Sequence, residues 1–441
     1  MTASLRVLIV CEHASARFGG EAALPLHYFR ILRQRGHPVW LITHARTRDE
    51  LAQLFPGEDR ILYIEDTTLH ILMWRASRLL PARLANFSVS YISRLACQLA
   101  QRRLARRLVA RQSIDIVHQP MPVSPREPSV MYGVGAPVVI GPMNGGLDYP
   151  PAFRGRSPLL ERCFVALGRW SASLLNRLMP GKRRAAFLLV ANGRTRSSLP
   201  AGVCQRVIEI VENGVDLSLW TPAAVETRVS SRDGPVTFLF LGRLVDWKSV
   251  DLLLYAFDRV RRQAPVRLLI AGDGAERARL ESLAGELGLR FEDEAPGSVT
   301  FKGWLSQPDS ARLLRDADCL VLPSLMECGG AVVLEAMCAA KPVIATAWGG
   351  PTDYLDETCG VLVPPTGREA LIQGFADAMA RLAQSPELRE SLGRKGREKV
   401  LTEYDWELKV DRVLQIYRQA LGPGGSRRSQ TLSLSGLRDG T

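Results

Sequence analysis

The sequence predicts an α/β protein built from two doubly wound domains, and three observations support this prediction. The chain has 441 residues, which is more than one ordinary hydrophobic core accommodates. Short β-branched runs alternate with amphipathic helical stretches throughout, as is typical of parallel sheets covered by helices on both faces. A polar stretch near the middle, containing Pro, Ser and Gly, interrupts this alternation.

The alternation yields two series of predicted strands, one on each side of the interruption. Because each series supplies enough strands for a parallel sheet of its own, we expect two separate sheets. The strands of the first series lie at residues 5–10, 39–43, 115–118, 138–140 and 187–190, and those of the second at 236–241, 266–271, 299–301, 319–323, 342–345 and 360–363.

The domain boundaries follow from turn signals and composition. The sequence Asn213-Gly214-Val215-Asp216 predicts a turn that opens the linker. The last twenty residues are rich in Gly and Ser and lack periodicity, which predicts a disordered tail. By pattern alone the last helix could pack on either domain. We therefore expect an N-terminal domain at 1–212, a linker at 213–234, a C-terminal domain at 235–404, a final helix at 405–421 and the tail at 422–441.

Composition predicts a cytoplasmic protein without a metal site. No run of about 18 apolar residues is present, so no spanning helix is expected. The short apolar run at residues 5–10 precedes Gly19-Gly20 and predicts a first strand rather than a signal peptide. The eight cysteines form no C-x-x-C pair, and the six histidines lack metal-ligand spacing, so we expect reduced cysteines.

The net charge of +12 favours anionic partners, and its location helps to choose among them. Much of it lies in residues 75–111 and 154–184, where Arg and Lys, Lys182 among them, alternate with Leu, Phe and Trp at helical spacing. In the second segment the residues spaced for one apolar helical face are Phe164, Leu167, Trp170, Leu174, Leu175 and Leu178. This pattern favours peripheral attachment to the inner face of an anionic membrane over an aromatic platform for nucleic acid. The alternative is a pair of helices packed on their own domain, each with a solvated basic rim.

The most informative segment is Pro323–Lys341, where a predicted strand ends and a helix begins near Ala331. The pair Gly329-Gly330 at the start of that helix leaves N–H groups free and lets a diphosphate approach the backbone. Glu335, one turn into the helix, suits ribose hydroxyls, and Glu327 before the helix suits sugar hydroxyls. Taken alone, the same pattern also fits a plain turn followed by a solvated glutamate.

A second segment places two cations after the strand at residues 236–241. Arg243 follows the carboxyl end of that strand, and Lys248 comes five residues later, before a helix. Ligands bind at the carboxyl ends of parallel strands, where an Arg fork and a Lys charge could neutralise a pyrophosphate. An isolated pair of this kind would more often be two surface cations.

Read together, these segments resemble family 4 retaining glycosyltransferases, which have the GT-B fold. The resemblance is dense over residues 211–362 and weaker at Gly19-Gly20 and at 404–406. The motifs that carry it, in the order seen in that family, are Gly242-Arg243 with Lys248, then Ala271-Gly272-Asp273-Gly274, Gly303-Trp304-Leu305, residues 318–324, and Glu327 separated by seven residues from Glu335.

The resemblance implies two Rossmann-like domains that face a cleft, with the final helix crossing back to the first domain. The donor would be a nucleotide diphosphate sugar, held mainly by the second domain without a metal or other cofactor. The implied roles are phosphate binding by Arg243 and Lys248, ribose binding by Glu335, donor-sugar binding by Glu327, Gly329 and Gly330, and approach of Gly20 to the diphosphate from the other domain.

The chain departs from the family in two places. The frequent Pro-Phe-Gly is replaced by Cys328-Gly329-Gly330, which leaves the identity of the donor open. Many relatives place a histidine after the fourth N-terminal strand, but residues 138–148 contain none. Asn144 could substitute as a hydrogen-bond donor to the sugar or the acceptor. His118, at the end of an earlier strand, could line the cleft or be structural.

Two other motifs are set aside. Asp316-Ala317-Asp318 resembles a D-x-D metal motif, but it leads directly into the buried strand at 319–322. Gly272-x-Gly274 lacks the third glycine of a dinucleotide fingerprint.

The predicted function is therefore transfer of a sugar, with retention of configuration, from a nucleotide diphosphate sugar to an acceptor hydroxyl. The relatives suggest a glycan or lipid-linked glycan acceptor in exopolysaccharide, lipopolysaccharide or glycolipid assembly. The alternatives are a GT-B epimerase or phosphorylase, and a catalytically inactive partner subunit that binds glycans or lipid.

Overall fold

The computed structural model describes residues 4–66, 82–156, 168, 171–223, 234–289, 291 and 295–422. The chain divides into two compact units, each described below by itself. The N-terminal unit comprises Met1–Gly146, Arg162–Glu212 and Lys409–Thr441, and the C-terminal unit comprises Leu147–Glu161 and Asn213–Leu408. Apart from Gly422, the predicted tail lies outside the described residues.

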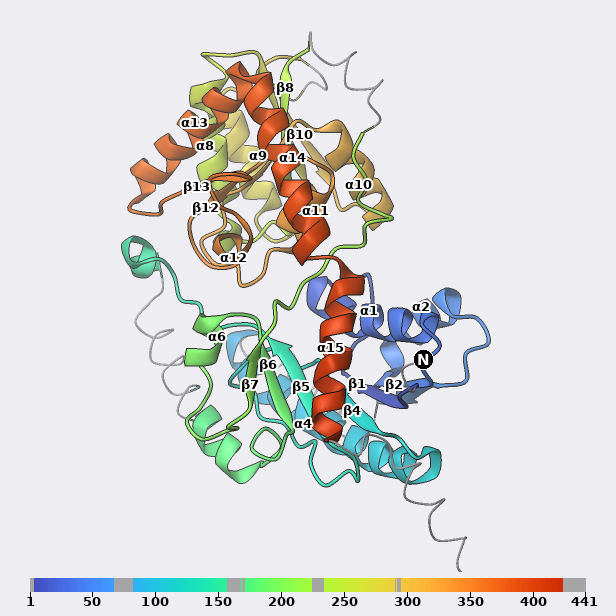
Figure 1. The fold of residues 1–441 in the computed structure, drawn as a ribbon. Helices are drawn as coiled ribbons and strands as arrows, with labels where there is room; N and C mark the ends of the chain where they lie inside the picture. Colours follow the sequence, from blue (N-terminus) through green and yellow to red (C-terminus); the bar gives the residue numbers. More distant parts are fainter. Residues whose placement is uncertain are drawn as a thin grey trace, which may run out of the picture. The chain divides into compact units, whose positions relative to one another are not determined.

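The N-terminal unit contains a seven-stranded parallel sheet with the strand order β3-β2-β1-β4-β5-β6-β7 (Figure 1). The chain leaves β1 in one direction across the sheet and resumes at β4 in the other, so the switch point lies between β1 and β4. The strands are β1 (Val7–Val10), β2 (Val39–His44), β3 (Ile61–Ile64), β4 (Ile116–Gln119), β5 (Val138–Met143), β6 (Phe187–Val190) and β7 (Val207–Glu209).

Five of these strands were predicted, and the two that were missed are the edge strands β3 and β7. Both are short, and neither is buried along its whole length. The interior strands β1, β2, β4 and β5 are buried at every residue, which produces the continuous apolar runs that mark them in the sequence. An edge strand has a neighbour on one side only and lacks this signal.

The helices of the N-terminal unit cover its sheet. Their bounds are α1 (Gly20–Gln34), η1 (Ala45–Thr47), α2 (Arg48–Leu54), α4 (Ala82–Gln112) and α6 (Gly193–Ser197). The last helix of the chain, α15 (Trp406–Leu421), belongs to this unit from Lys409 onwards. Asp411 of α15 forms an ion pair with Arg35 at 2.6 Å, just after α1, and Figure 1 shows the helix running along this unit.

His118 lies in the core of this unit, between β5 and α15, and has a structural role. The residue is fully buried; its Nε2 lies 2.6 Å from the carbonyl oxygen of Gly141, and its Nδ1 lies 2.7 Å from the Tyr417 hydroxyl of α15. Burial lowers its pKa to about 4, so the ring is neutral at neutral pH. Of the two roles left open by the sequence, the structure supports the structural one.

The C-terminal unit contains a six-stranded parallel sheet with the order β10-β9-β8-β11-β12-β13. Every predicted strand of the second half is present. The sheet consists of β8 (Val236–Leu241), β9 (Val266–Ala271), β10 (Val299–Gly303), β11 (Cys319–Leu322), β12 (Val343–Thr346) and β13 (Gly360–Val363). Because β8 starts one half of the order and β11 the other, the switch point lies between these two strands.

The helices of this unit lie on both faces of the sheet in Figure 1. They are η2 (Pro151–Arg156), η3 (Asp246–Lys248), α8 (Val250–Val260), α9 (Arg277–Glu286), α10 (Gln307–Asp316), α11 (Ala331–Cys338), α12 (Pro351–Tyr354), α13 (Arg368–Gln384) and α14 (Pro386–Glu403). The segment that begins at Leu147 groups with this unit: Trp348 Nε1 donates to the Asp148 carbonyl oxygen at 2.9 Å.

The basic segments are only partly described, and one expectation about them is wrong. Lys182, expected to face a membrane, is 1% exposed, and its Nζ donates to the carbonyl oxygens of Ser124 and Pro125. Leu174 and Leu178, predicted on the same apolar face, are 43% and 69% exposed. Phe164, Leu167, Trp170 and residues 75–81 lie outside the described residues. None of the helices in the described ranges combines the length and apolarity needed to cross a membrane.

Candidate functional site

The predicted donor residues of the C-terminal unit gather at its switch point. Arg243 and Lys248 follow β8, and Glu327, Gly329 and Gly330 follow β11, the neighbouring strand. The two loops are joined by a backbone hydrogen bond from Leu325 N to the Trp247 carbonyl oxygen at 2.9 Å. The crevice outside the carboxyl ends of strands at such a point is where open α/β sheets bind ligands.

Lys248 and Glu327 form an ion pair across these loops. The ammonium Nζ of Lys248, which ends η3, contacts Oε2 of Glu327, and each side chain is 13% exposed. Both charges are therefore largely withdrawn from water, and each compensates the other. An anionic ligand that binds Lys248 must compete with the Glu327 carboxylate.

The N-terminus of α11 directly follows the loop that carries Glu327 and has no side-chain cap. Gly330 precedes the helix with a φ of +79°, a left-handed conformation that suits glycine, and no side chain caps the helix. Within the first turn Val333 N donates to the Gly330 carbonyl oxygen at 2.9 Å, and no side chain competes with an anion for the N–H groups before it, where the helix dipole favours negative charge.

A second glycine pair, which the sequence analysis did not single out, holds this loop in place. Gly350 N donates to the Glu327 carbonyl oxygen at 2.6 Å. A Cβ at Gly350 would lie 2.1 Å from the Gly329 carbonyl oxygen, and one at Gly349 would lie 2.3 Å from that of Glu327. Only glycines permit such close approach of the two backbones, so Gly349 and Gly350 fix the position of the Glu327 loop. The sequence Trp348-Gly349-Gly350-Pro351 directly after β12 was the available signal.

Glu335 lies on α11 and is partly buried. Desolvation by burial raises the pKa of its carboxyl to about 8. The protonated form of this carboxyl therefore persists to a higher pH than that of a solvated glutamate. A protonated carboxyl can donate one hydrogen bond as well as accept others, so it remains suited to a pair of hydroxyls.

Arg243 is exposed and lies in a loop packed tightly against its neighbour. Gly242 N donates to the Ala271 carbonyl oxygen at 3.0 Å, and a Cβ at Gly272 would lie 1.8 Å from the Gly242 carbonyl oxygen. The glycines of the motif around residues 271–274 thus serve close packing of the loops after β8 and β9.

The two predicted site residues of the N-terminal unit remain predictions. Gly20 is exposed and is the first residue of α1, with open space where a side chain would stand. The Asn144 amide donates to the Glu212 carboxylate, and its Oδ1 accepts from the Thr195 hydroxyl at 3.3 Å. Asn144 therefore already has hydrogen-bond partners inside its own unit.

In the D-x-D-like sequence Asp316-Ala317-Asp318, the last residue forms hydrogen bonds between two strands. Asp318 Oδ2 accepts a hydrogen bond from Thr237 N at 2.7 Å, and Asp318 N donates to the Thr237 carbonyl oxygen at 2.9 Å. This carboxylate therefore joins the start of β11 to β8.

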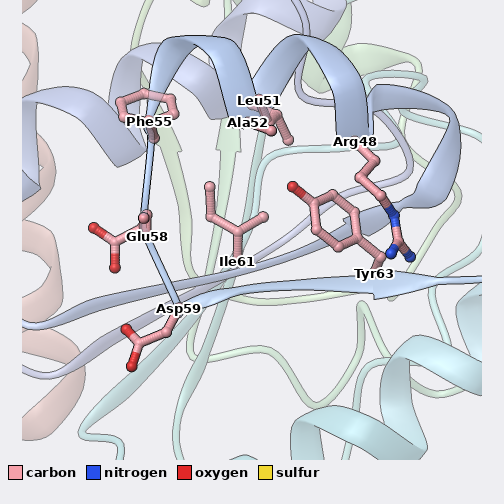
Figure 2. Close-up of a pocket in the computed structure, with 9 residues that line it drawn as sticks. Arg48, Leu51, Ala52, Phe55, Glu58, Asp59, Ile61 and Tyr63 are labelled. Carbon is pink, nitrogen blue, oxygen red and sulfur yellow. The ribbon is translucent and has the colours of Figure 1, made fainter.

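A pocket of about 310 Å³ lies elsewhere, between α2 and the edge strand β3 of the N-terminal unit. Figure 2 shows Ile61 and Tyr63 of β3 facing α2, with Glu58 and Asp59 on the connecting loop. Glu58 forms an ion pair with Arg33, and the Arg48 guanidinium lies 4.6 Å from the centre of the Tyr63 ring. No residue of the candidate site lines this pocket, so we do not assign it to that site.

Part of the chain is similar to known glycosyltransferases. Residues 226–399 match the family model for glycosyl transferases group 1. The D-inositol 3-phosphate glycosyltransferase of Kribbella flavida is 34% identical over 48% of this chain and 51% of its own length. The alpha-D-kanosaminyltransferase of Streptomyces kanamyceticus is 31% identical over 59% of this chain and 66% of its own. The chain spans about half the length of the first curated relatives it matches.

Solved structures match over nearly the whole chain. HepE of Anabaena in complex with UDP aligns with a TM-score of 0.63 and 15% identity, over 93% of this chain and 99% of its own. A glycosyltransferase of Rickettsia africae aligns with a TM-score of 0.64 and 16% identity, over 96% of this chain and 100% of its own. At these identities the likeness shows the fold, and the expected GT-B fold is confirmed.

The raised pKa of Glu335 predicts how one substitution changes stability. A carboxyl with a higher pKa in the folded than in the unfolded chain contributes stability that is complete below the unfolded value and is lost as pH rises through the folded value. Gln cannot ionise and escapes this loss. Between pH 5 and pH 9 the unfolding free energy of the wild type should therefore fall relative to that of Glu335→Gln by more than about 1 kcal/mol.

Denaturant unfolding of both proteins at the two pH values measures this difference. Glu398→Gln, which alters a 61% exposed glutamate of α14, is the matched control and should show no such change. Parallel behaviour of wild type and Glu335→Gln would contradict the desolvation of Glu335.

Proposed function

We propose that the protein transfers a sugar from a nucleotide diphosphate sugar to an acceptor hydroxyl, because residues 226–399 match the family model for glycosyl transferases group 1. The observation that carries this proposal is the position of Lys248 beside the uncapped start of α11 at the switch point. Two solved structures of one similar protein support the donor class, since HepE of Anabaena is described in complex with UDP and with UDP and glucose.

The diphosphate of the donor would take the place of Glu327 on Lys248. It would lie between this ammonium, the Arg243 guanidinium and the N–H groups at Gly329 and Gly330. The leaving nucleoside diphosphate gains negative charge in the transition state, so cations and helix N–H groups directed at it lower the barrier. The partly buried setting strengthens these interactions relative to water.

The two glutamates would then take separate roles. Glu327, released from Lys248, can accept hydrogen bonds from hydroxyls of the donor sugar, while Glu335 binds the ribose hydroxyls. Gly20 of the N-terminal unit would allow the diphosphate to approach its backbone, and Asn144 would assist at the reacting sugar only if it exchanges its bond to Glu212.

The proposed transfer proceeds with retention and without a metal or other cofactor. The bond between the anomeric carbon and the phosphate oxygen breaks, the acceptor oxygen bonds to the same face of that carbon, and the departing phosphate takes the acceptor proton. No protein nucleophile is needed. The proposed acceptor is a glycan or lipid-linked glycan used in polysaccharide, lipopolysaccharide or glycolipid assembly.

The rival functions give different products. An epimerase or phosphorylase would act without joining the sugar to a second saccharide, and an inactive binding subunit would form no product. Mass spectrometry of reactions that contain a panel of nucleotide sugars and membrane extract separates these outcomes.

Loss of the phosphate-binding cations should slow turnover without unfolding the protein. We expect Lys248→Ala or Arg243→Ala to reduce turnover about 100-fold or more, since each removes a charge that stabilises the leaving group. Arg312→Ala, at a 70% exposed site on α10, is the control and should be neutral. Wild-type turnover in folded Lys248→Ala would refute the assignment.

Because Glu327 competes for Lys248, Glu327→Gln should slow turnover yet bind UDP at least as tightly in calorimetry.

Metal independence is a separate prediction. Because the cations and helix N–H groups are proposed to neutralise the diphosphate, the initial rate in excess EDTA should stay within about twofold of the untreated rate, a change too small to reflect loss of a Lewis acid. Abolition by EDTA with recovery on adding Mn²⁺ would require a bound metal instead.

We also propose peripheral attachment of the N-terminal unit to anionic membranes, through exposed Leu174 and Leu178 and nearby exposed arginines such as Arg183. Replacing both leucines by Ser should reduce co-sedimentation with phosphatidylserine vesicles, and salt should weaken it, because each basic residue contributes about 1 kcal/mol near the surface. Leu54→Ser, at a 50% exposed site on α2, is the control. If the wild-type protein stays in the supernatant with these vesicles at low salt, the proposal of membrane attachment is wrong.

A further inference from the structure

A group of polar and aromatic side chains lies beyond the carboxyl ends of β1 and β2, beside the switch point of the N-terminal sheet. Glu12, His13 and Phe18 belong to the loop between β1 and α1, and His44 ends the neighbouring strand β2. We call these four residues the β1-loop cluster. They lie beyond the carboxyl ends of adjacent parallel strands, at the edge where such sheets bind ligands. No motif of the donor site includes them.

The cluster is held in a defined geometry. His13 Nε2 lies 3.4 Å from Glu12 Oε1, and the His13 and His44 rings have centres 6.4 Å apart. His44 N donates to the Glu12 carbonyl oxygen at 3.0 Å, which ties the loop to β2. On the far side of the loop, Glu50 of α2 accepts from the Ser15 hydroxyl at 2.5 Å and from Ala16 N at 2.8 Å. The loop is therefore positioned before any ligand arrives.

Part of this cluster is open to solvent. Phe18 is 54% exposed, although its ring is held perpendicular to the His13 ring with centres 5.6 Å apart. The side chains of Glu12 and His13 are 30% and 23% exposed, so each is partly accessible from the same loop, although His13 Nδ1 itself is buried. An exposed aromatic ring beside a carboxylate and an imidazole offers one apolar surface and several hydrogen-bonding atoms together.

The charges favour a neutral, hydroxyl-rich ligand over an anion. Burial alone would raise the pKa of Glu12, but the hydrogen bond and charge of His13 and the charges of Arg94 and Arg46 lower it, so the carboxylate is ionised. An ionised carboxylate only accepts hydrogen bonds, and hydroxyl groups supply the donors. Glu50 adds a second carboxylate to the loop, which disfavours a phosphate, while Asp66 beside His44 is paired with Arg46 at 3.2 Å.

We propose that the β1-loop cluster binds a sugar ring of the acceptor, with Glu12 and His13 on ring hydroxyls and Phe18 against its C–H face. The inference rests on the proposed function, because only a glycosyltransferase needs an acceptor saccharide here. It names residues that would set acceptor specificity in the N-terminal unit.

Saturation-transfer NMR tests the proposal with defined probes: the methyl glycosides of glucose, galactose, mannose and N-acetylglucosamine. The full-length protein should transfer saturation to the ring C–H protons of at least one glycoside. Phe18→Ala and Glu12→Gln should each reduce that signal at least threefold, whereas Phe18→Trp should retain it. Leu54→Ala and Glu65→Gln, which alter exposed residues of the same unit outside the cluster, are matched controls and should leave the signal unchanged.

Two results would overturn the proposal: saturation of no glycoside, or equal signals in wild type and both cluster variants. Broadening of the phosphorus signal of inorganic phosphate that disappears in Glu12→Gln would also overturn it, because the site would then bind anions. UDP calorimetry on the same samples separates the two levels of inference. UDP binding without glycoside contact refutes the β1-loop cluster alone, whereas folded wild-type protein that binds no UDP refutes the proposed donor site.

Discussion

The ion pair between Lys248 and Glu327 is the interaction on which the candidate site depends. Both side chains are mostly withdrawn from water, so loss of either partner would leave a poorly solvated charge, at a typical cost of about 3–5 kcal/mol. The pair fixes the loop after β11 against η3 at the switch point. It also keeps the ammonium in place for a diphosphate, which brings more negative charge than the carboxylate it would displace. The Glu327 carboxylate thus contacts Lys248 where the diphosphate is proposed to bind.

Close backbone packing makes that pair possible. Gly350 lies so near Gly329 that any side chain would clash, and its N–H holds the Glu327 carbonyl oxygen. The Glu327 side chain is therefore placed by contacts from the loop after β12, a strand further along the sheet. A similar contact between Gly242 and Gly272 places the loop of Arg243. These glycines of the C-terminal unit thus fix the conformation of the loops. The positions of Glu327 and Arg243 follow from that conformation.

Sequence reasoning found the interior strands and the donor motif because both leave local signals: continuous apolar runs, and charged residues at fixed distances from them. It missed β3 and β7, whose partial exposure breaks the run. It misplaced Lys182, because a basic residue that reaches two buried carbonyl oxygens looks the same in sequence as one that faces solvent. It located Glu335 but not the raised pKa of its carboxyl, which is caused by burial and leaves no signal in the local sequence.

The donor site and the β1-loop cluster differ in whether their residues form a recognisable sequence motif. In the C-terminal unit the recognised group is proposed to be a diphosphate, which every nucleotide sugar donor shares, and backbone N–H groups and cations at fixed positions suffice for it. In the N-terminal unit the proposed ligand is a saccharide, whose hydroxyls differ between acceptors and must be matched by individual side chains. Glu12, His13 and Phe18 therefore belong to no motif shared with relatives in the sequence analysis. When the acceptor differs from one enzyme to another, its binding site can be proposed only from the geometry of the loop and the chemistry of its side chains.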